Sequence, residues 1–311
     1  MLTPMSEHIL ATVTDGVGRV ALNRPRTINA LNLEMFEALF STLQAWHRDD
    51  EVASVEFAGI GERGFSAGAD VRELAGLVAS DGGWLAFLEL EYALDGLIAG
   101  YAKPTTAHMH GITMGGGLGI GSKTDRRIVD ATTVMAMPET KIGLFPDAGV
   151  MYRLSRGGAV GTHVALTSST FGGGDALLLG LADESADGPL PTPLANAVAD
   201  WIEECYAGDD VVEIARRLES HAHPDARQAG RDLRARSPYA VHVALRALRR
   251  ARRLDQAEVL AQDLHLAEAV VPVDFAEGVR ALLVDKDNTP RWRHARLEDV
   301  PTSLVDAAFA W

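Results

Sequence analysis

The alternation of short apolar segments with helical ones in the first half of the chain most constrains its fold. Residues 9–13 and 17–22 alternate apolar with small or polar side chains around Asp15-Gly16, which predicts a β-hairpin. Asn32 is predicted to cap a helix over residues 33–46, whose apolar residues recur at helical spacing. We expect further strands over residues 54–60, 105–110, 127–130 and 134–137, and further helices from residue 71 and over residues 84–101.

The second half of the chain has a different character. From residue 159 onward it is predicted to be mostly helical, interrupted by a loop over residues 186–193. Strands interleaved with helices and followed by helices predict a mixed α/β (α+β) fold with a helical C-terminal third.

Two glycine-containing turns each follow a predicted strand and open a predicted helix. One is Ser66-Ala67-Gly68-Ala69-Asp70, and the other is the run 111–117, which follows its strand directly and ends in three glycines. Glycine permits a sharp turn, and its missing Cβ lets a substrate carbonyl approach the backbone N–H groups. Together the turns predict a two-donor oxyanion hole. A tight packing turn for the glycines and a helix cap at Asp70 are the structural alternatives.

Two carboxylates, Glu139 and Asp147, stand in an otherwise apolar, turn-rich segment that also holds two prolines. Carboxylates that transfer protons, combined with amides that bind an oxyanion, indicate acyl chemistry. The structural alternatives are a charge at a helix N-terminus for Glu139 and an ordinary turn residue for Asp147.

The net charge limits the kinds of partner that the chain can bind, and the cysteine content indicates its redox compartment. The net charge of −14 argues against nucleic acid and anionic membranes as main partners. A single cysteine, Cys205, allows no intrachain disulfide and is consistent with a reducing cytoplasm. The N-terminal residues do not suggest a signal peptide. His108 and His110 have no third ligand at metal spacing, so we expect no metal site.

The two turns and Pro138-Glu139, together with Leu22–Pro25 and Asn29–Asn32, resemble the crotonase (enoyl-CoA hydratase/isomerase) superfamily. The resemblance implies a right-handed ββα spiral core over residues 1–223 and a helical C-terminal region over residues 224–311. It also implies an acyl-CoA substrate, an oxyanion hole formed by the amides of Ala69 and Gly116, and a homo-oligomer, either a trimer or a hexamer.

Within this superfamily, residues 110–117, 136–147 and 274–292 are most similar to the 3-hydroxyisobutyryl-CoA hydrolases. That similarity implies that Glu139 and Asp147 are catalytic and that Glu91 contacts the substrate; a solvated helix face is the alternative for Glu91. No separate cofactor is expected, because coenzyme A is part of the substrate. The remaining substrate-binding residues implied by the family are Arg24, Ala67, Gly68, Asp70, Arg72, Gly115 and Lys286.

The chain also departs from its relatives. Hydratases of the superfamily use a second glutamate two residues after the glycine triplet, where this chain has Gly119. Hydrolysis is therefore favoured over water addition. An isomerase or hydratase using Glu139 alone and a non-catalytic CoA-binding protein remain as alternatives. Residues 156–223 match the hydrolases weakly, which leaves the acyl group open.

Overall fold

The computed structural model describes residues 6–80 and 82–311. Residues 1–5, which bear on the expected lack of a signal peptide, lie outside this part. The chain forms two compact units. The first unit comprises Met1–Asp70, Ala86–Met135 and Phe171–Pro191, and the second comprises Val71–Leu85, Ala136–Thr170 and Thr192–Trp311.

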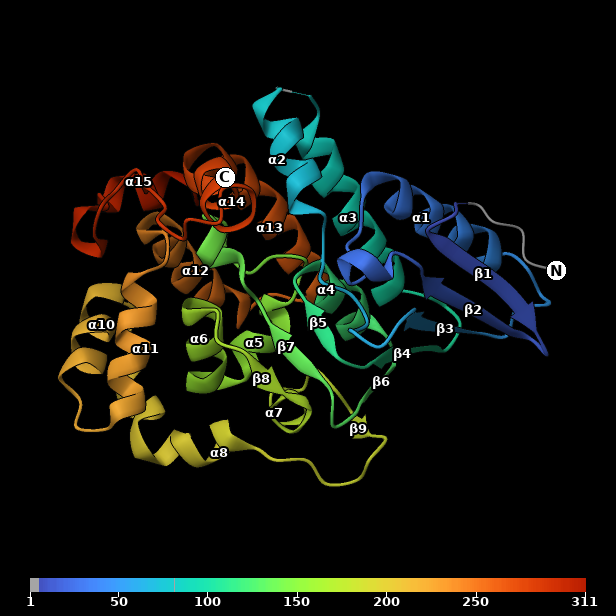
Figure 1. Cartoon of the computed structure of the whole chain (residues 1–311), viewed down its shortest axis with the longest axis horizontal. Helices are drawn as coiled ribbons and strands as arrows, with labels where there is room; N and C mark the ends of the chain where they lie inside the picture. Colours follow the sequence, from blue (N-terminus) through green and yellow to red (C-terminus); the bar gives the residue numbers. More distant parts are fainter. Residues whose placement is uncertain (1–5, 81) are drawn as a thin grey trace. The chain divides into compact units, whose positions relative to one another are not determined.

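The first unit contains a six-stranded sheet (Figure 1), in the order β1-β2-β3-β4-β6-β9. The predicted hairpin is confirmed: β1 and β2 pair antiparallel, and Asp15 and Gly16 both have positive φ, as the favoured two-residue hairpin turn requires. The remaining neighbours pair in parallel. The strands are β1 (Ile9–Thr14), β2 (Val17–Leu22), β3 (Ser54–Gly59), β4 (Thr105–Met109), β6 (Arg126–Val129) and β9 (Glu184–Ser185).

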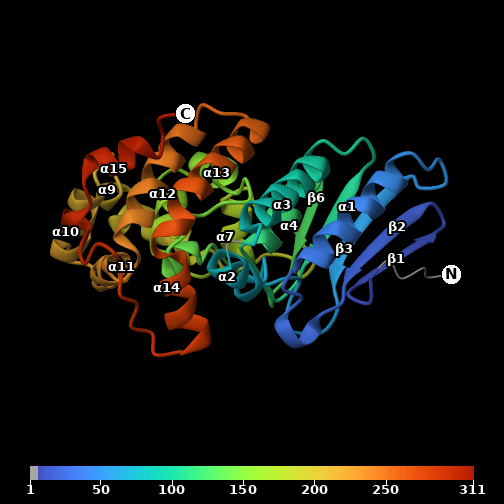
Figure 2. The ribbon, with the colours of Figure 1, turned by 90° about the horizontal axis from the view of Figure 1, so that it is seen from above.

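Helices α1 (Leu33–His47) and α3 (Trp84–Ala99) run next to each other along the same side of this sheet (Figure 2). Asn32 caps α1 by accepting a hydrogen bond from the backbone N–H of Met35, as predicted. Phe36 of α1 is fully buried and meets Phe87 of α3 edge to face, with ring centroids 5.4 Å apart. Each such buried aromatic ring stabilises the fold by about 1.5–3 kcal/mol.

A second, three-stranded sheet corrects two sequence-based expectations. Its strands are β5 (Ile112–Met114), β7 (Val134–Ala136) and β8 (Phe171–Gly172). The glycine run was expected to follow β4 directly, but β5 lies within it and precedes α4 (Gly116–Lys123). The region after residue 159 was expected to be mostly helical with one loop, and no strand was predicted there. The structure has β8, which pairs with β7 and precedes α7 (Gly173–Leu178), and β9, which pairs with β6 and follows α7.

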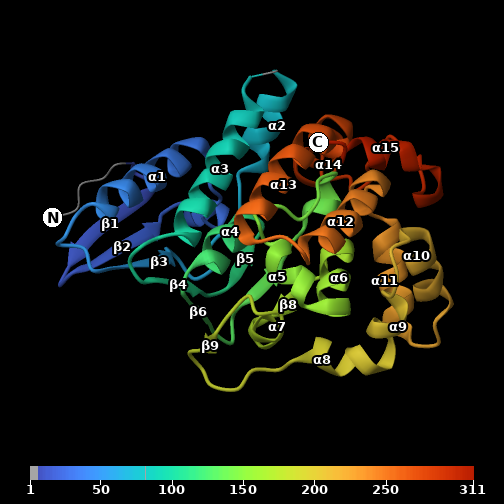
Figure 3. The same ribbon diagram turned by 180° about the vertical axis from the view of Figure 1, so that it is seen from behind.

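The second unit is helical. Figure 3 shows α10 and α11 side by side within it. The predicted boundary at residue 224 coincides with the start of α11, which His223 caps, and the domain division itself stays a prediction. No described helix is both long and apolar enough to span a membrane. The principal helices are α2 (Val71–Ala79), α5 (Met151–Arg156), α6 (Gly158–Thr167), α8 (Pro193–Ala197), α9 (Glu203–Cys205), α10 (Val211–Ser220), α11 (Pro224–Arg234), α12 (Pro238–Ala251), α13 (Gln256–Val270), α14 (Ala276–Val279) and α15 (Thr302–Ala307).

Shorter helical segments complete this unit. Glu139 begins the 3-10 helix η2 (Glu139–Ile142). The π-helical segments η4 (Val271–Phe275) and η5 (Arg280–Val284) lie before and after α14. Pro272 in η4 has no N–H to donate to the preceding turn, which accounts for the departure from α-helical bonding at that point. Cys205 is buried in α9, and burial raises the pKa of its thiol, in keeping with a structural residue.

Candidate active site

The two glycine-containing turns of the first unit are hydrogen-bonded to each other. Ser66 N–H donates to Ile112 O at 3.2 Å, and Met114 N–H donates to Ser66 O at 2.9 Å. Parallel and antiparallel bridges also join Ser66 to Thr113 and Gly64 to Gly111. Segments more than forty residues apart in the sequence therefore form one small backbone assembly.

This assembly brings the backbone nitrogens of Ala69 and Gly116 close together. A Cβ on Gly116 would lie 3.2 Å from Ala69 N, and a Cβ on Gly68 would lie 2.8 Å from Gly116 N. Gly116 is the first residue of α4, so its N–H has no acceptor within the helix. Gly115 before it has φ 50° and ψ −130°, a conformation that essentially only glycine adopts. The arrangement suits the predicted oxyanion hole, which stays a prediction.

Ala69 is aligned by a bridge to Leu31. Leu31 N–H donates to Gly68 O, and Asp70 N–H donates to Leu31 O, so the groups on each side of Ala69 make the bridge. In a parallel pairing of this kind the N–H of the middle residue points away from the partner segment. The Ala69 N–H therefore faces away from Leu31.

Glu91 of α3 lies beside the same turn. Its residue is only 3% exposed, whereas Glu89 on the same helix is exposed, so the solvated-face alternative is wrong for Glu91. A Cβ on Gly116 would overlap Glu91 Oε1. A side chain at position 116 would require the Glu91 carboxylate to move and would crowd the Ala69 amide, which favours glycine there. The predicted substrate contact of Glu91 is consistent with this placement and stays a prediction.

Glu139 and Asp147 lie in the second unit and interact electrostatically. Their residues are 5% and 6% exposed. Burial, and then the negative charge of Asp147, raise the pKa of Glu139 well above its usual value. Glu139 Oε2 is buried and has no hydrogen-bond partner among the described residues. A buried acid with a strongly shifted pKa and an unpartnered oxygen is typical of a catalytic group.

Close backbone packing holds the turn that carries Glu139. Gly143 ends η2 with φ 76°, and its N–H donates to Glu139 O. A Cβ on Gly143 would overlap the backbone of Asp274, and a Cβ on Gly278 would overlap Ile142. The absence of two side chains thus lets η2 rest directly on η4 and α14. Glu139 is the acidic residue in the first turn of this short helix, so the alternative of a charge at a helix N-terminus also describes it. That alternative does not account for its burial or its raised pKa.

The residues assigned to the coenzyme have partners within their own units. Both terminal nitrogens of Arg24 donate to Asp70 Oδ2 at 3.1 Å, and Nη1 also donates to Ala30 O. Ala67 N–H donates to Ile28 O at 2.8 Å. Arg72 Nη2 donates to Leu283 O at 2.9 Å. Their contacts with a coenzyme stay predictions.

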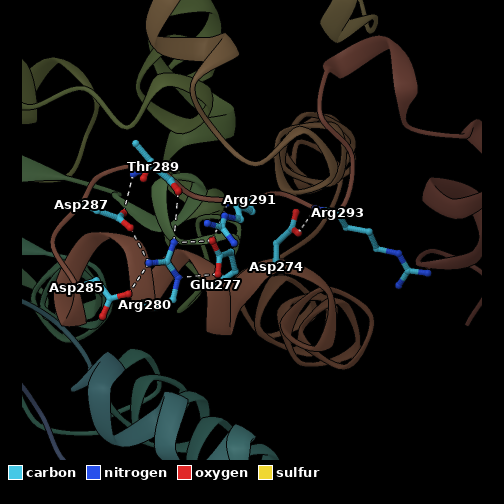
Figure 4. Close-up of polar contacts among 8 residues, drawn as sticks. All are labelled: Asp274, Glu277, Arg280, Asp285, Asp287, Thr289, Arg291 and Arg293. Carbon is cyan, nitrogen blue, oxygen red and sulfur yellow. Dashed lines mark hydrogen bonds and ion pairs between the residues drawn. The ribbon is translucent and has the colours of Figure 1, made fainter.

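Lys286 lies in an ordered loop that Arg280 organises (Figure 4). Arg280 donates to Glu277, Asp285 and Asp287, and the two aspartates are the immediate neighbours of Lys286. Lys286 is exposed and has φ 57°. This cluster shapes the backbone at Lys286, and sequence reasoning missed it: only the closely spaced charges of residues 277–287 could have indicated it.

Figure 4 also shows how residues 291–293 are hydrogen-bonded to side chains of η4 and α14. Glu277 Oε1 accepts a hydrogen bond from Arg291 N at 2.7 Å, and Asp274 Oδ1 accepts one from Arg293 N at 2.9 Å (Figure 4). Asp274 Oδ2 also accepts a hydrogen bond from Ser237 Oγ, at the start of α12. Asp274, whose backbone packs against Gly143 at the end of η2, is therefore hydrogen-bonded both to the start of α12 and to residue 293.

The described residues contain no cluster of three or more His, Cys, Asp or Glu side chains that could hold a metal ion. The imidazole of His110 instead contacts Gly61 O at 2.8 Å.

Comparisons with known proteins agree with this architecture. The chain matches the enoyl-CoA hydratase/isomerase family over residues 17–189 and 184–309. It is 33% identical to the mitochondrial 3-hydroxyisobutyryl-CoA hydrolase of Gallus gallus, covering 99% of this chain and 90% of that protein. With the human enzyme of the same name the identity is 31%, over 96% and 87% of the two chains.

Solved structures resemble it over nearly the whole chain. A carnitinyl-CoA dehydratase from Mycobacterium thermoresistibile is 38% identical with a TM-score of 0.94, covering 98% of this chain and 97% of that one. An enoyl-CoA hydratase from Rhodobacter sphaeroides is 33% identical with a TM-score of 0.93 at the same coverage. These matches confirm the predicted crotonase-like fold. The chain belongs to the enoyl-CoA hydratase/isomerase family, the crotonase superfamily.

Proposed function

We propose that this chain is an acyl-CoA thioester hydrolase that acts on 3-hydroxyisobutyryl-CoA or a similar short β-hydroxyacyl-CoA. The observation that carries the proposal is the buried Glu139, with its raised pKa and unpartnered Oε2, beside Asp147. The curated relatives named as 3-hydroxyisobutyryl-CoA hydrolases support the choice of substrate.

In the proposed reaction, the amides of Ala69 and Gly116 bind the thioester oxygen, where negative charge develops. Loss of one such donor typically lowers kcat by about 10²–10³-fold. Ionised Glu139 removes a proton from water as the water oxygen attacks the carbonyl carbon. The carbon–sulfur bond then breaks, the sulfur takes a proton, and the products are the free acid and coenzyme A. The proposal requires that Glu139 reach the thioester held by these amides.

A covalent route uses the same residues. Glu139 attacks the carbonyl carbon itself, coenzyme A leaves as the thiol, and water then hydrolyses the resulting anhydride. In both routes Asp147 binds the acyl hydroxyl or assists proton transfer. Neither route requires a metal or redox cofactor, because a thioester already has a good leaving group.

The remaining expectations form part of the same proposal. Glu91 contacts the acyl group, and Arg24, Arg72 and Lys286 contact the coenzyme together with the turns at Ala67–Asp70 and Gly115. A homo-oligomer, a trimer or a hexamer, and a role in valine catabolism are expected from the family resemblance, and a cytoplasmic location is expected from the single cysteine. The names of the vertebrate relatives given above assign those proteins to mitochondria.

A thiol-release assay with a panel of acyl-CoA thioesters tests the proposal. We expect coenzyme A to be released fastest from 3-hydroxyisobutyryl-CoA, and release to fall at least about 100-fold in Glu139→Gln. Glu89→Gln, a change at an exposed position, is the matched control. Release that is equal in wild type and Glu139→Gln would contradict the assignment of Glu139.

A second candidate is an isomerase or hydratase that uses Glu139 alone, and the names of the two solved structures, a dehydratase and a hydratase, favour the hydratase. Against it, Gly119 stands where hydratases of the superfamily have their second glutamate. Loss of enoyl absorbance from crotonyl-CoA without thiol release from any thioester would favour this candidate. Tight coenzyme A binding without turnover on any substrate would indicate a non-catalytic binding protein instead.

A further inference from the structure

Asp263 is a fully buried carboxylate in α13 that the proposed chemistry does not use. It is 0% exposed, like its neighbour Gln262. Its Oδ2 accepts a hydrogen bond from the backbone N–H of Gly149 at 2.8 Å, 114 residues away in sequence. A buried carboxylate is costly unless it is hydrogen-bonded, so this contact is more than incidental packing.

The N–H that Asp263 binds belongs to the turn that carries Asp147. Ala148 and Gly149 both have left-handed backbone conformations, with φ 52° and 66°. Val150 N–H donates to Asp147 O at 3.0 Å and closes the turn. Alanine avoids the left-handed region because of its Cβ, and such a residue persists only where its surroundings fix it.

We propose that Asp263 is a positioning residue that holds the Asp147–Val150 turn and so keeps the Asp147 carboxylate beside Glu139. This inference rests on the proposed function, in which Asp147 assists Glu139. The α13 helix is suited to this role because its start is fixed by a capping box between Asp255 and Glu258. The Asp147 charge that raises the pKa of Glu139 is consistent with a turn held close to that residue.

The chain offers a matched control for this inference. Gln262 is adjacent to Asp263 and equally buried, but its Nε2 donates to Ala247 O of α12 and not to the Asp147 turn. Each side chain makes a buried hydrogen bond from α13 to another segment. Only the loss of the Asp263 side chain should change the position of Asp147 relative to Glu139.

The test measures kcat and KM for 3-hydroxyisobutyryl-CoA in Asp263→Ala, Asp263→Asn and Gln262→Ala, all well below their unfolding temperatures. We expect Asp263→Ala to lower kcat by about 100-fold with KM changed less than about threefold, because the loss is one of geometry at reacting groups. Asp263→Asn keeps an oxygen acceptor and should retain at least about tenfold more activity than Asp263→Ala. Gln262→Ala should keep kcat within about threefold of wild type.

Several outcomes would overturn the inference. An unchanged kcat in Asp263→Ala, or an equal loss in Asp263→Ala and Gln262→Ala, would reduce Asp263 to a structural role. If Asp263→Ala does not fold, Asp263→Asn decides: a folded variant that loses activity only through a higher KM contradicts positioning. Absence of thiol release by the wild type would refute the proposed function itself, and is thus distinguishable from failure of this inference.

Discussion

At the scale of single residues, the buried Glu139 is expected to lower the stability of the fold when it is ionised, the form that the proposed reaction uses. Its pKa in the folded chain is raised above the unfolded value by burial and by Asp147. Its stabilising contribution is therefore complete below the unfolded pKa and is lost as the pH rises through the folded pKa. Glutamine resembles the protonated acid, so Glu139→Gln should stabilise the fold at high pH.

Urea unfolding between pH 4.5 and pH 8 checks this prediction. We expect the stability gain of Glu139→Gln to grow with pH and to reach about 1–3 kcal/mol, the usual cost of an unsatisfied buried polar group. Glu89→Gln, at an exposed position, should change stability by less than about 0.5 kcal/mol. A gain that is largest at acid pH would contradict the raised pKa.

Gly116 supports a second residue-scale prediction. A methyl group there would overlap Glu91 Oε1 and crowd the Ala69 amide, so Gly116→Ala should lower kcat by about 100-fold or more. Gly76, within α2, has open space around it, so Gly76→Ala should leave kcat unchanged and raise stability by about 0.5–1 kcal/mol. Steady-state thiol release and thermal unfolding measure both; full activity in Gly116→Ala would contradict the predicted crowding of Glu91 and the Ala69 amide.

At the scale of elements, His163 links α6 to the segment that contains α9. It is 6% exposed, its Nδ1 lies 2.8 Å from Tyr206 Oη, and its ring meets Trp201 edge to face at 5.3 Å. Burial lowers the pKa of His163 to about 4. The unfolded chain therefore binds a proton between pH 6.5 and 4 that the folded chain does not.

Stability from His163 is thus present above pH 6.5 and lost as the pH falls toward 4. This loss amounts to about 3 kcal/mol over the full window. His163→Gln should be less stable at pH 7 but should lose correspondingly less stability on acidification. Denaturant unfolding from pH 7.5 to 4.5 measures this, with exposed His108→Gln as control. An unchanged acid dependence in His163→Gln would refute the assignment.

Local chemistry explains which elements the sequence predicted. The hairpin at Asp15-Gly16 and the cap at Asn32 depend on neighbouring residues only. Strand β8, by contrast, is two residues long and exists through the pairing of Met135 with Phe171. Such a segment has no alternation to detect, because its structure is decided by a distant partner.

In the candidate site, too, features set by neighbouring residues could be predicted from the sequence, and those set by distant partners could not. The glycines at the two strand-to-helix turns could be recognised in the sequence because glycine readily adopts the positive φ angles found there. The pairing of Arg24 with Asp70 and the contact of Asp263 with Gly149 join residues 46 and 114 positions apart. Neither partner has a local feature that points to the other, so these contacts needed the structure.

At the scale of the whole molecule, fold similarity does not decide the reaction. The two solved structures described above are named as a dehydratase and a hydratase, whereas the curated relatives are named as hydrolases. One architecture supports several reactions because function depends on a few residues at the site. Glu139, Asp147 and Gly119 are therefore more informative about this chain than its TM-scores.

The net charge of −14 leads to a prediction about salt. The phosphate groups of coenzyme A are repelled by the chain as a whole, while Lys286 is proposed to attract them at short range. Raising the ionic strength from about 0.01 M to 0.1 M shortens the Debye length from about 30 Å to 10 Å. The long-range repulsion is screened over this range, and contacts shorter than about 10 Å persist.

We therefore expect kcat/KM for an acyl-CoA substrate to rise by about twofold or more up to roughly 0.1 M salt and to fall at higher salt, where local contacts are screened too. Lys286→Gln should lower kcat/KM throughout, keep the initial rise and flatten the later fall. Exposed Arg296, which pairs with Asp299, provides the control Arg296→Gln. A steady fall of kcat/KM from the lowest salt would mean that local cations outweigh the charge of the whole chain, because attraction alone decreases with screening at every salt concentration.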